Sequence, residues 1–253
     1  MHMPERYDIF SPATDVLEVQ HLPQVDSTNA FMQRAARAGR THPQLVTARR
    51  QTAGHGRLGR AWHGGEGDLM FSLGMPLAPK DWSGLSLAVG VTIAEALHPD
   101  VRLKWPNDVQ LHGRKLAGIL IETVGAPTLH APERFVIIGV GINIAPRDAD
   151  CLSVPPAWLR ELDPTWTPPR ALDVVVPPLL GMLPRFAAHG FALWRERYTE
   201  RDALRGRTVT VTDGTIGVAD GVTSGGALRV IGQAGVREIV SDEVSVRATE
   251  NHV

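Results

Sequence analysis

Cysteine and long apolar runs are scarce in this sequence of 253 residues. Cys151 is the single cysteine, which excludes a disulfide within the chain and any metal site built from several cysteine thiolates. No apolar run reaches eighteen residues, and the opening MHMPERYDIF has no basic segment followed by an apolar one. We therefore expect no membrane span and no signal peptide, and a protein that works in the reducing cytoplasm.

Net charge is also nearly absent. The 26 Lys and Arg residues offset the 27 Asp and Glu residues, so the formal net charge is −1. A protein that binds nucleic acid or a membrane in bulk needs an excess of positive charge, so we expect neither partner. With 43% hydrophobic and 21% charged residues, the chain has an ordinary globular composition and is long enough to bury a sizeable core.

The first half of the chain predicts alternating helices and strands. Asp26, Ser27 or Thr28 can cap a helix that Gly39 ends. Strands are expected at residues 45–51 and 69–76, and a buried helix at residues 85–98. Two strands flank a turn at residues 112–113, with Pro106 breaking the first, and a central apolar strand covers residues 134–144. This pattern predicts a larger α+β domain, residues 1–203.

The second half of the chain differs from the first in composition and in hydrophobic pattern. Residues 155–169 are rich in proline, and residues 170–203 look helical, with a break expected at Pro177 and Pro178 because proline donates no amide hydrogen bond. After residue 204, short alternating stretches are separated by Asp-Gly and Gly-Gly turns at residues 213–214 and 225–226. We therefore predict a small all-β, barrel-like domain, residues 204–253.

The stretch GHGRLGRAW, residues 54–62, contains the spacing G-x-G-x-x-G of the dinucleotide-binding fingerprint. That fingerprint requires a helix directly after the glycines, because the helix N-terminus receives the pyrophosphate. Here HGGEGD follows with three more glycines, and then the strand-like LMFSLGM, so no helix of ten residues fits. The stretch is therefore not a dinucleotide site.

The same stretch belongs to a glycine-rich loop of roughly fifteen residues between two strands, a length that is usually functional or disordered. Glycine lets a backbone approach a ligand, and arginine offers paired donors for carboxylate or phosphate. The loop alone leaves two interpretations open, a solvated basic hairpin and a segment that folds over an anionic ligand. Its basic side chains are Arg49, Arg50, His55, Arg57 and Arg60.

Three further stretches carry polar chemistry. KWPND, residues 104–108, combines a cation, an aromatic ring, a proline, an amide and a carboxylate, and GVGIN, residues 139–143, ends the central strand with an amide. GRKLAGILIE, residues 113–122, places Lys115 at the start of an apolar strand, where alternation puts it on the face of Ala117, Ile119 and Ile121. By itself, Lys115 is either a solvated strand end or a catalytic cation.

Together, VDSTN (residues 25–29), QTAGHGRLGRAW (residues 51–62), KWPND, GRKLAGILIE and GVGIN resemble, in order and spacing, the biotin–protein ligases. The C-terminal RGRTVTV unit resembles the small SH3-like domain of that family. The resemblance extends from about residue 20 onward. It implies a mixed β-sheet catalytic domain flanked by helices, similar to class II aminoacyl-tRNA synthetases, and a C-terminal all-β SH3-like barrel.

The resemblance implies a two-step reaction. Biotin and ATP, with Mg²⁺, give biotinyl-5′-AMP and pyrophosphate, and the biotinyl group then passes to a lysine of a biotin carboxyl carrier protein or domain of acetyl-CoA carboxylase. The first step brings two anions together, so cations must offset their repulsion. The second requires water to be kept from a reactive anhydride, which a loop closing over the ligand can do.

The resemblance also implies residue roles, with Lys115 and Arg57 catalytic and no metal ligand assigned to the protein. Gly59 and Asp108 would support the loop, Asp108 by pairing with one of its arginines. The family loop commonly reads G-R-G-R-x-G-R, so His55 replaces an arginine and could weaken the hold on the ligand or make it pH-dependent. Biotin contacts are expected from Ser27, Thr28, Asn29, Gln51, Gly54, His55, Gly56, Arg57, Lys115 and Gly118. Nucleotide contacts are expected from Arg57, Arg60, Trp62, Asn107, Lys115 and Asn143.

Three alternatives differ in function. A lipoate–protein ligase has a similar fold and adenylates another carboxylic acid. A biotin-responsive repressor of this family carries a helix-turn-helix domain of some sixty residues, which the residues before Val25 are too few to form. A catalytically inactive adenylate-binding module would not need the intact Lys115 and Arg57. The sequence leaves the oligomeric state open, a homodimer included.

Calorimetric titration distinguishes the first alternative from a biotin ligase, because the two enzymes bind different acids before any chemistry occurs. We expect tight binding of biotin, since the five stretches resemble the biotin enzymes. Tight binding of lipoate combined with no binding of biotin would refute the assignment.

Overall fold

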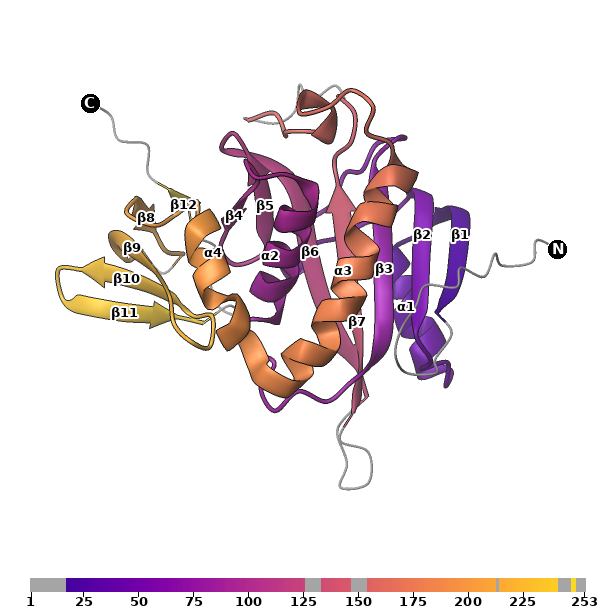
Figure 1. The fold of residues 1–253 in the computed structure, drawn as a ribbon, viewed down its shortest axis with the longest axis horizontal. Coiled ribbons are helices and arrows are strands. Elements are labelled where there is room, and N and C mark those ends of the chain that lie inside the picture. Colours follow the sequence, from indigo (N-terminus) through magenta and orange to yellow (C-terminus); the bar gives the residue numbers. More distant parts are fainter. Residues whose placement is uncertain (1–16, 126–132, 147–153, 213, 241–246, 249–253) are drawn as a thin grey trace.

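The structure is a computed structural model that describes residues 17–125, 133–146, 154–212, 214–240 and 247–248. Cys151, Asp213 and the first sixteen residues lie outside the described part of the chain. Within it, a large mixed sheet with helices on both faces is followed by a smaller antiparallel sheet (Figure 1). The predicted α+β class, with a small β unit at the C-terminal end, is therefore confirmed.

The large sheet has seven strands in the order β1-β2-β3-β7-β6-β5-β4. β1 and β2 are parallel, and all other neighbours are antiparallel. β7 is the middle strand, as its apolar sequence predicts, because both of its faces are covered. The strands are β1 (Glu18–Val25), β2 (Gln44–Gln51), β3 (Leu69–Leu77), β4 (Arg102–Lys104), β5 (Asp108–Leu111), β6 (Arg114–Val124) and β7 (Arg134–Ile142).

Helices cover the two faces of this sheet unequally. α1 (Thr28–Arg37) lies alone on one face, whereas α2 (Leu85–Leu97) and α3 (Pro168–His189) lie on the other (Figure 1). The larger core lies under α2 and α3, and a small separate cluster around Met32 and Ile137 lies under α1. α1 begins as predicted, with the Ser27 hydroxyl accepting a hydrogen bond from the Ala30 amide.

α3 runs through Pro177 and Pro178, so the predicted break there is wrong. Both prolines are exposed, whereas a buried stripe that includes Val175, Val176 and Leu179 packs the helix against α2 and β3. Tertiary packing therefore overrides the two lost amide donors. The helix ends at Gly190, followed by the 3₁₀ turn η3 (Gly190–Trp194) and α4 (Arg195–Arg201). By length and composition alone, Pro168–Arg201 could cross a membrane, but its apolar stripe lies in the core.

The small sheet has five strands, all antiparallel, in the order β11-β10-β9-β8-β12, which is consistent with an SH3-like barrel. Several hydrogen bonds hold it to the rest of the chain. Directly after β4, the Trp105 indole N–H donates to Gly226 O at 3.0 Å, and the Ala203 amide before the small sheet donates to Leu103 O of β4 at 2.8 Å. Trp105 of KWPND is thus a buried structural residue. The strands are β8 (Thr208–Thr210), β9 (Ile216–Val222), β10 (Leu228–Gly232), β11 (Gly235–Ile239) and β12 (Arg247–Ala248).

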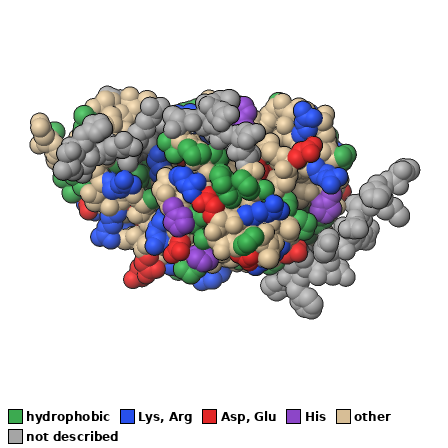
Figure 2. Space-filling view, turned by 90° about the horizontal axis from the view of Figure 1, so that it is seen from above, with side chains coloured by type: hydrophobic (Ala, Val, Ile, Leu, Met, Phe, Trp, Pro, Cys, Tyr) green, Lys and Arg blue, Asp and Glu red, His purple; other side chains and the backbone are tan. Residues whose placement is uncertain are grey.

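Charges of both signs are mixed on the surface. Figure 2 shows Lys and Arg side chains interspersed with Asp and Glu side chains on the face that it presents. Several form exposed ion pairs, such as Arg34 with Asp26 at 2.7 Å and Arg170 with Asp163 at 2.8 Å. Exposed pairs of this kind contribute little to stability, so burial of apolar side chains must hold the fold together.

Replacing Pro177 with alanine tests how α3 tolerates its prolines. Pro177→Ala restores an amide donor in the helix interior, so we expect the free energy of unfolding to rise by about 1–2 kcal/mol and the melting temperature by several degrees. Pro168→Ala is the matched control, because Pro168 occupies the first turn, where a backbone amide would have no partner within the helix. A lower melting temperature for Pro177→Ala, or an equal rise in the control, would contradict this account.

Candidate functional site

A cavity of about 230 Å³ lies on the α1 side of the large sheet, over β3, β7 and β6. The start of α1, the loop of residues 52–68 between β2 and β3 (the lid loop), the β4–β5 connection and β6 contribute its walls. Of the residues predicted from the sequence, thirteen line it: Ser27, Thr28, Asn29, Gln51, His55, Gly56, Arg57, Arg60, Trp62, Asn107, Asp108, Lys115 and Gly118.

The floor of the cavity is nearly bare backbone. Gly139 of β7 pairs with Ser72 and Leu120, and two residues further Gly141 pairs with Met70 and Gly118. A side chain at Gly139 would collide with the Asn29 amide, and one at Gly141 would collide with the Trp62 indole. The two glycines of GVGIN therefore make room for side chains from α1 and from the lid loop, a role that the sequence did not reveal.

The lid loop folds back on itself as a small hairpin above this floor. Two backbone bonds hold it, from the Gly56 amide to Arg60 O at 2.7 Å and from the Trp62 amide to Gly54 O at 2.9 Å. Its tip is the 3₁₀ turn η1 (Arg57–Gly59), where Gly59 has a φ of +69°. No dinucleotide-type helix follows the glycines, as predicted. Movement of the loop stays a prediction.

Gly54 and Gly59 shape the lid loop without lining the cavity. A Cβ atom at Gly54 would lie 2.9 Å from the backbone oxygen of Trp62 and 2.8 Å from Gln51 Nε2, so a larger residue would require the lid loop to shift. Asp68, which the sequence did not single out, holds the far end of the loop. Its carboxylate accepts hydrogen bonds from the Ile144 amide at 2.9 Å and from the Gly65 amide at 2.8 Å.

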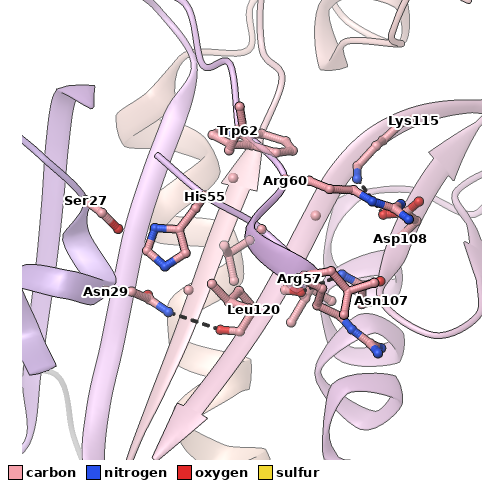
Figure 3. Close-up of a pocket in the computed structure, with 18 of the residues that line it drawn as sticks. Ser27, Asn29, His55, Arg57, Arg60, Trp62, Asn107, Asp108, Lys115 and Leu120 are labelled. Carbon is pink, nitrogen blue, oxygen red and sulfur yellow. Dashed lines mark hydrogen bonds and ion pairs between the residues drawn. The ribbon is translucent and has the colours of Figure 1, made fainter. Parts of the chain in front are cut away.

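Trp62 lies against the glycine floor. Its ring packs on Gly141 and Gly118, and Lys115 Nζ lies 5.6 Å from the ring centroid, within the range of a cation–π contact. The indole N–H is buried and has no hydrogen-bond partner among the described residues. Figure 3 shows the ring at one side of the cavity, between the lid loop and the sheet.

Lys115 faces the cavity because β6 carries an irregularity next to it. Val109 pairs with Ala117 but Gln110 pairs with Lys115, so Leu116 is an extra residue in the ladder. The bulge moves Lys115 to the face of Gly118. The prediction that Lys115 shares a face with Ala117 is therefore wrong, since strict alternation does not hold across a bulge.

Lys115 Nζ forms an ion pair with Asp108 Oδ1 at 2.6 Å. We expected Asp108 to pair with an arginine of the lid loop, but its partner in the structure is Lys115. Figure 3 shows that the Arg60 side chain extends toward the same end of the cavity. This cationic end comprises Arg57, Arg60, Lys104 and Lys115, with Asp108 among them.

The opposite, polar end is formed by Ser27, Thr28, Asn29 and Gln51, with His55 nearby (Figure 3). Gln51 Oε1 accepts hydrogen bonds from the Thr28 amide at 2.8 Å and the Thr28 hydroxyl at 3.1 Å. Asp26 lies just before this turn, where two hydrogen bonds from Arg34 hold its pKa at about 2. Its backbone carbonyl accepts from the Ala53 amide at 2.8 Å, which fixes the start of the lid loop.

The two predicted asparagines differ in position. Asn107 lines the cavity and donates to Ile119 O at 2.9 Å. Asn143 is 2% exposed and does not line it, so the expected direct contact with a nucleotide is not supported. Its amide donates instead to Lys115 O and Ala157 O, both at 3.1 Å, and thereby braces the strand that carries Lys115.

The arrangement suits an elongated ligand with a hydrogen-bonding head and an anionic tail. The polar end offers uncharged donors and acceptors, the bare floor gives room between the ends, and the cationic end attracts carboxylate or phosphate. Among the described residues, no group of three or more His, Cys, Asp or Glu side chains could hold a metal ion.

Comparisons with known proteins agree with this geometry. Residues 22–143 match the biotin/lipoate A/B protein ligase family. The chain is 33% identical to the bifunctional ligase/repressor BirA of Escherichia coli (strain K12), over 90% of this chain and 74% of that protein. It is 34% identical to the biotin–[acetyl-CoA-carboxylase] ligase of Paracoccus denitrificans, over 88% of this chain and 98% of that one. A structure of biotin protein ligase from Aquifex aeolicus with biotin and ATP matches with a TM-score of 0.79 and 28% identity, over 91% and 99% of the two chains.

The glycine floor can be tested by filling it. Gly141→Ala should displace the Trp62 indole, so we expect its fluorescence emission to shift to longer wavelength and to become easier to quench. The contribution of Trp62 is obtained by difference, with Trp62→Phe made in each background. Gly181→Ala is the control, because a Cβ atom there meets nothing within 4 Å. An unchanged Trp62 signal in Gly141→Ala would show that the ring does not depend on this floor.

Proposed function

The chain belongs to the biotin/lipoate A/B protein ligase family, and we propose that it joins biotin to a biotin carboxyl carrier protein or domain. In this proposal, ATP first converts biotin to biotinyl-5′-AMP, and a lysine of the carrier then accepts the biotinyl group. The observation that carries it is one cavity with a polar end, a glycine floor and a cationic end that includes Lys115.

Adenylation requires the biotin carboxylate to attack the α-phosphorus of ATP, so that a P–O bond forms and pyrophosphate leaves. The two reactants are both anionic, and their repulsion dominates the barrier unless fixed cations offset it. Lys115 and Arg57 are assigned this catalytic role, with Arg60 on the phosphates. Lys115 is placed by the β6 bulge and by Asp108, and so it is oriented before the ligand arrives.

The remaining contacts divide along the cavity. Ser27, Thr28, Asn29 and Gln51 would hold the ureido ring of biotin, and His55, Gly56 and Gly118 its middle. Trp62 would stack on adenine after exchanging its contact with Lys115, and Asn107 would lie beside the nucleotide. Asn143 is assigned a bracing role behind Lys115, because it does not reach the cavity.

Mg²⁺ fits this site as a companion of ATP. Mg²⁺ is commonly held by one or two carboxylates together with phosphate oxygens, and it supplies charge neutralisation at the polyphosphate. Asp108 is a carboxylate that lines the cationic end, and it would be the protein contact. Residues of the chain would still position and polarise the biotin carboxylate, through Lys115 and Arg57.

In the second step, the amine of the carrier lysine attacks the carbonyl carbon of the anhydride, an amide bond forms, and AMP leaves. The lid loop would exclude water from the anhydride until the carrier docks. We further propose that residues 1–203 form the catalytic domain and residues 204–253 a separate SH3-like domain, and that the enzyme acts in the cytoplasm.

Pyrophosphate release tests this function directly. The protein is mixed with ATP, Mg²⁺ and either biotin or lipoate, and then with a carrier domain. We expect release with biotin and a mass increase of one biotinyl group on the carrier. Release with lipoate and none with biotin would overturn the proposal.

Substitution of Lys115 tests the catalytic assignment. Lys115→Ala should lower the single-turnover rate of adenylate formation on the order of a hundred- to a thousandfold at saturating biotin and ATP, because a preorganised charge is lost. Its melting temperature should stay close to that of the wild type, since the side chain is 43% exposed. Lys115→Arg should recover only part of the rate.

Lys80→Ala is the control, because Lys80 is exposed and does not line the cavity. It should form adenylate at the wild-type rate. If Lys115→Ala also reacts within a few fold of the wild type, Lys115 is a solvated strand residue and not a catalytic one.

A further inference from the structure

Two residues behind the polar end, Ser72 and Glu122, touch the cavity wall without lining the cavity. Ser72 lies on β3 and is fully buried, and Glu122 lies on β6. Between them, the Asn29 amide lies across Gly139 of β7, in the row in which Ser72, Gly139 and Leu120 are paired. A single side chain of α1 thus connects three neighbouring strands.

Glu122 determines which way the Asn29 amide points. Asn29 Nδ2 lies 2.8 Å from Glu122 Oε2 and 3.4 Å from Leu120 O, and both of these oxygens accept hydrogen bonds. If the amide were turned over, its own oxygen would face two acceptors. Nδ2 must therefore point to β6, and Oδ1 must point to Ser72.

The orientation of Asn29 in turn fixes the direction of the next two hydrogen bonds. Because Asn29 Oδ1 can only accept, the single proton of the Ser72 hydroxyl is donated to it. The Thr28 hydroxyl then has two acceptors, Ser72 Oγ at 2.8 Å and Gln51 Oε1 at 3.1 Å. Its proton is used within the protein in either case, so Thr28 Oγ1 offers lone pairs to a ligand.

Gln51 completes the pattern with the opposite polarity. Its Oε1 accepts from the Thr28 amide, so its Nε2 lies on the other side, against Gly54. The polar end therefore presents an acceptor at Thr28 next to a donor at Gln51. A cyclic urea, which carries N–H groups beside a carbonyl oxygen, is complementary to that pair, whereas a dithiolane ring is not.

We infer that Ser72 and Glu122 are positioning residues that set the hydrogen-bond polarity of the head-group site and so select a cyclic urea. The inference rests on the proposed function, because it assigns the polar end to the biotin ring. Neither residue touches substrate. Each acts through Asn29 and Thr28, and each therefore affects the binding of biotin without contributing to the chemistry at the cationic end.

Glu122→Gln and Ser72→Ala test the inference. Glutamine can donate as well as accept, so it lets the Asn29 amide turn over, and alanine removes the hydroxyl that links Asn29 to Thr28. We expect each variant to raise the KM for biotin on the order of tenfold, with kcat and the KM for ATP within about twofold of the wild type. Desthiobiotin keeps the urea ring and lacks the sulfur-containing ring, so its KM should rise by the same factor in both variants.

Matched controls separate positioning from general destabilisation. Glu95→Gln alters an exposed carboxylate on α2 that pairs with Arg197, and Thr92→Val removes a buried hydroxyl that bonds only within α2. Both controls should keep the wild-type KM for biotin, and all variants are compared after their melting temperatures are measured. Should Ser72→Ala fail to fold, Glu122→Gln decides alone, because the two side chains have the same shape.

The outcomes separate two failures. If the wild type releases pyrophosphate with biotin but both variants keep a KM for biotin within twofold of it, the positioning inference is wrong and the proposed function stands. A drop in kcat together with an equal rise in the KM for ATP also overturns the inference, because it indicates a disturbed cavity. If the wild type does not use biotin, the proposed function fails and the inference fails with it.

Discussion

The close approach of side chains to bare backbone on one face of the large sheet is the constraint on which the cavity depends. Gly139 and Gly141 let Asn29 and Trp62 lie directly on β7. The intervening Val140 is buried in the main core on the opposite face. One face of the strand therefore packs into the main core, while on the other face Phe135 and Ile137 pack under α1 and Gly139 and Gly141 form the cavity floor. The apolar face anchors the strand, so the two glycine positions can accept the side chains of Asn29 and Trp62 in place of side chains of their own.

KWPND connects that floor to the small sheet. Trp105 is buried and donates to Gly226 O, while two residues later Asn107 exchanges hydrogen bonds with Ile119 of β6, donating to its carbonyl oxygen and accepting from its amide. A shift of the small sheet would therefore move the cavity wall, because the residue that bonds to the small sheet and the residue that lines the cavity lie within the same five-residue stretch. Among the described residues, no strand of one sheet is paired in the ladder of the other, but the hydrogen bond from Trp105 to Gly226 links the small sheet to a segment that lines the site.

Local patterns predicted what depends on local physics. The Ser27 cap, the apolar central strand and the absence of a helix after GHGRLGRAW follow from nearby residues, and each agrees with the structure. Two expectations failed where distant packing decides: α3 continues through Pro177 because its other face is buried, and a bulge turns Lys115 toward the cavity. Asn143 lies behind Lys115, and its contact with a nucleotide stays a prediction. The role of Ser72 could not be predicted from the sequence, because a single serine within an apolar strand belongs to no recognisable motif.

The ion pair of Lys115 with Asp108 shows how such a site can be stable before it binds anything. Arg57, Arg60, Lys104 and Lys115 line one end of a cavity, and their mutual repulsion would destabilise the folded chain if nothing opposed it. Asp108 offsets part of that repulsion at a distance of 2.6 Å from Lys115. An anionic ligand that enters this end would add negative charge beside these four cations. In the proposed function, the positive charge that would attract the polyphosphate would also bring the carboxylate of biotin up to it, and this is the condition that adenylation requires.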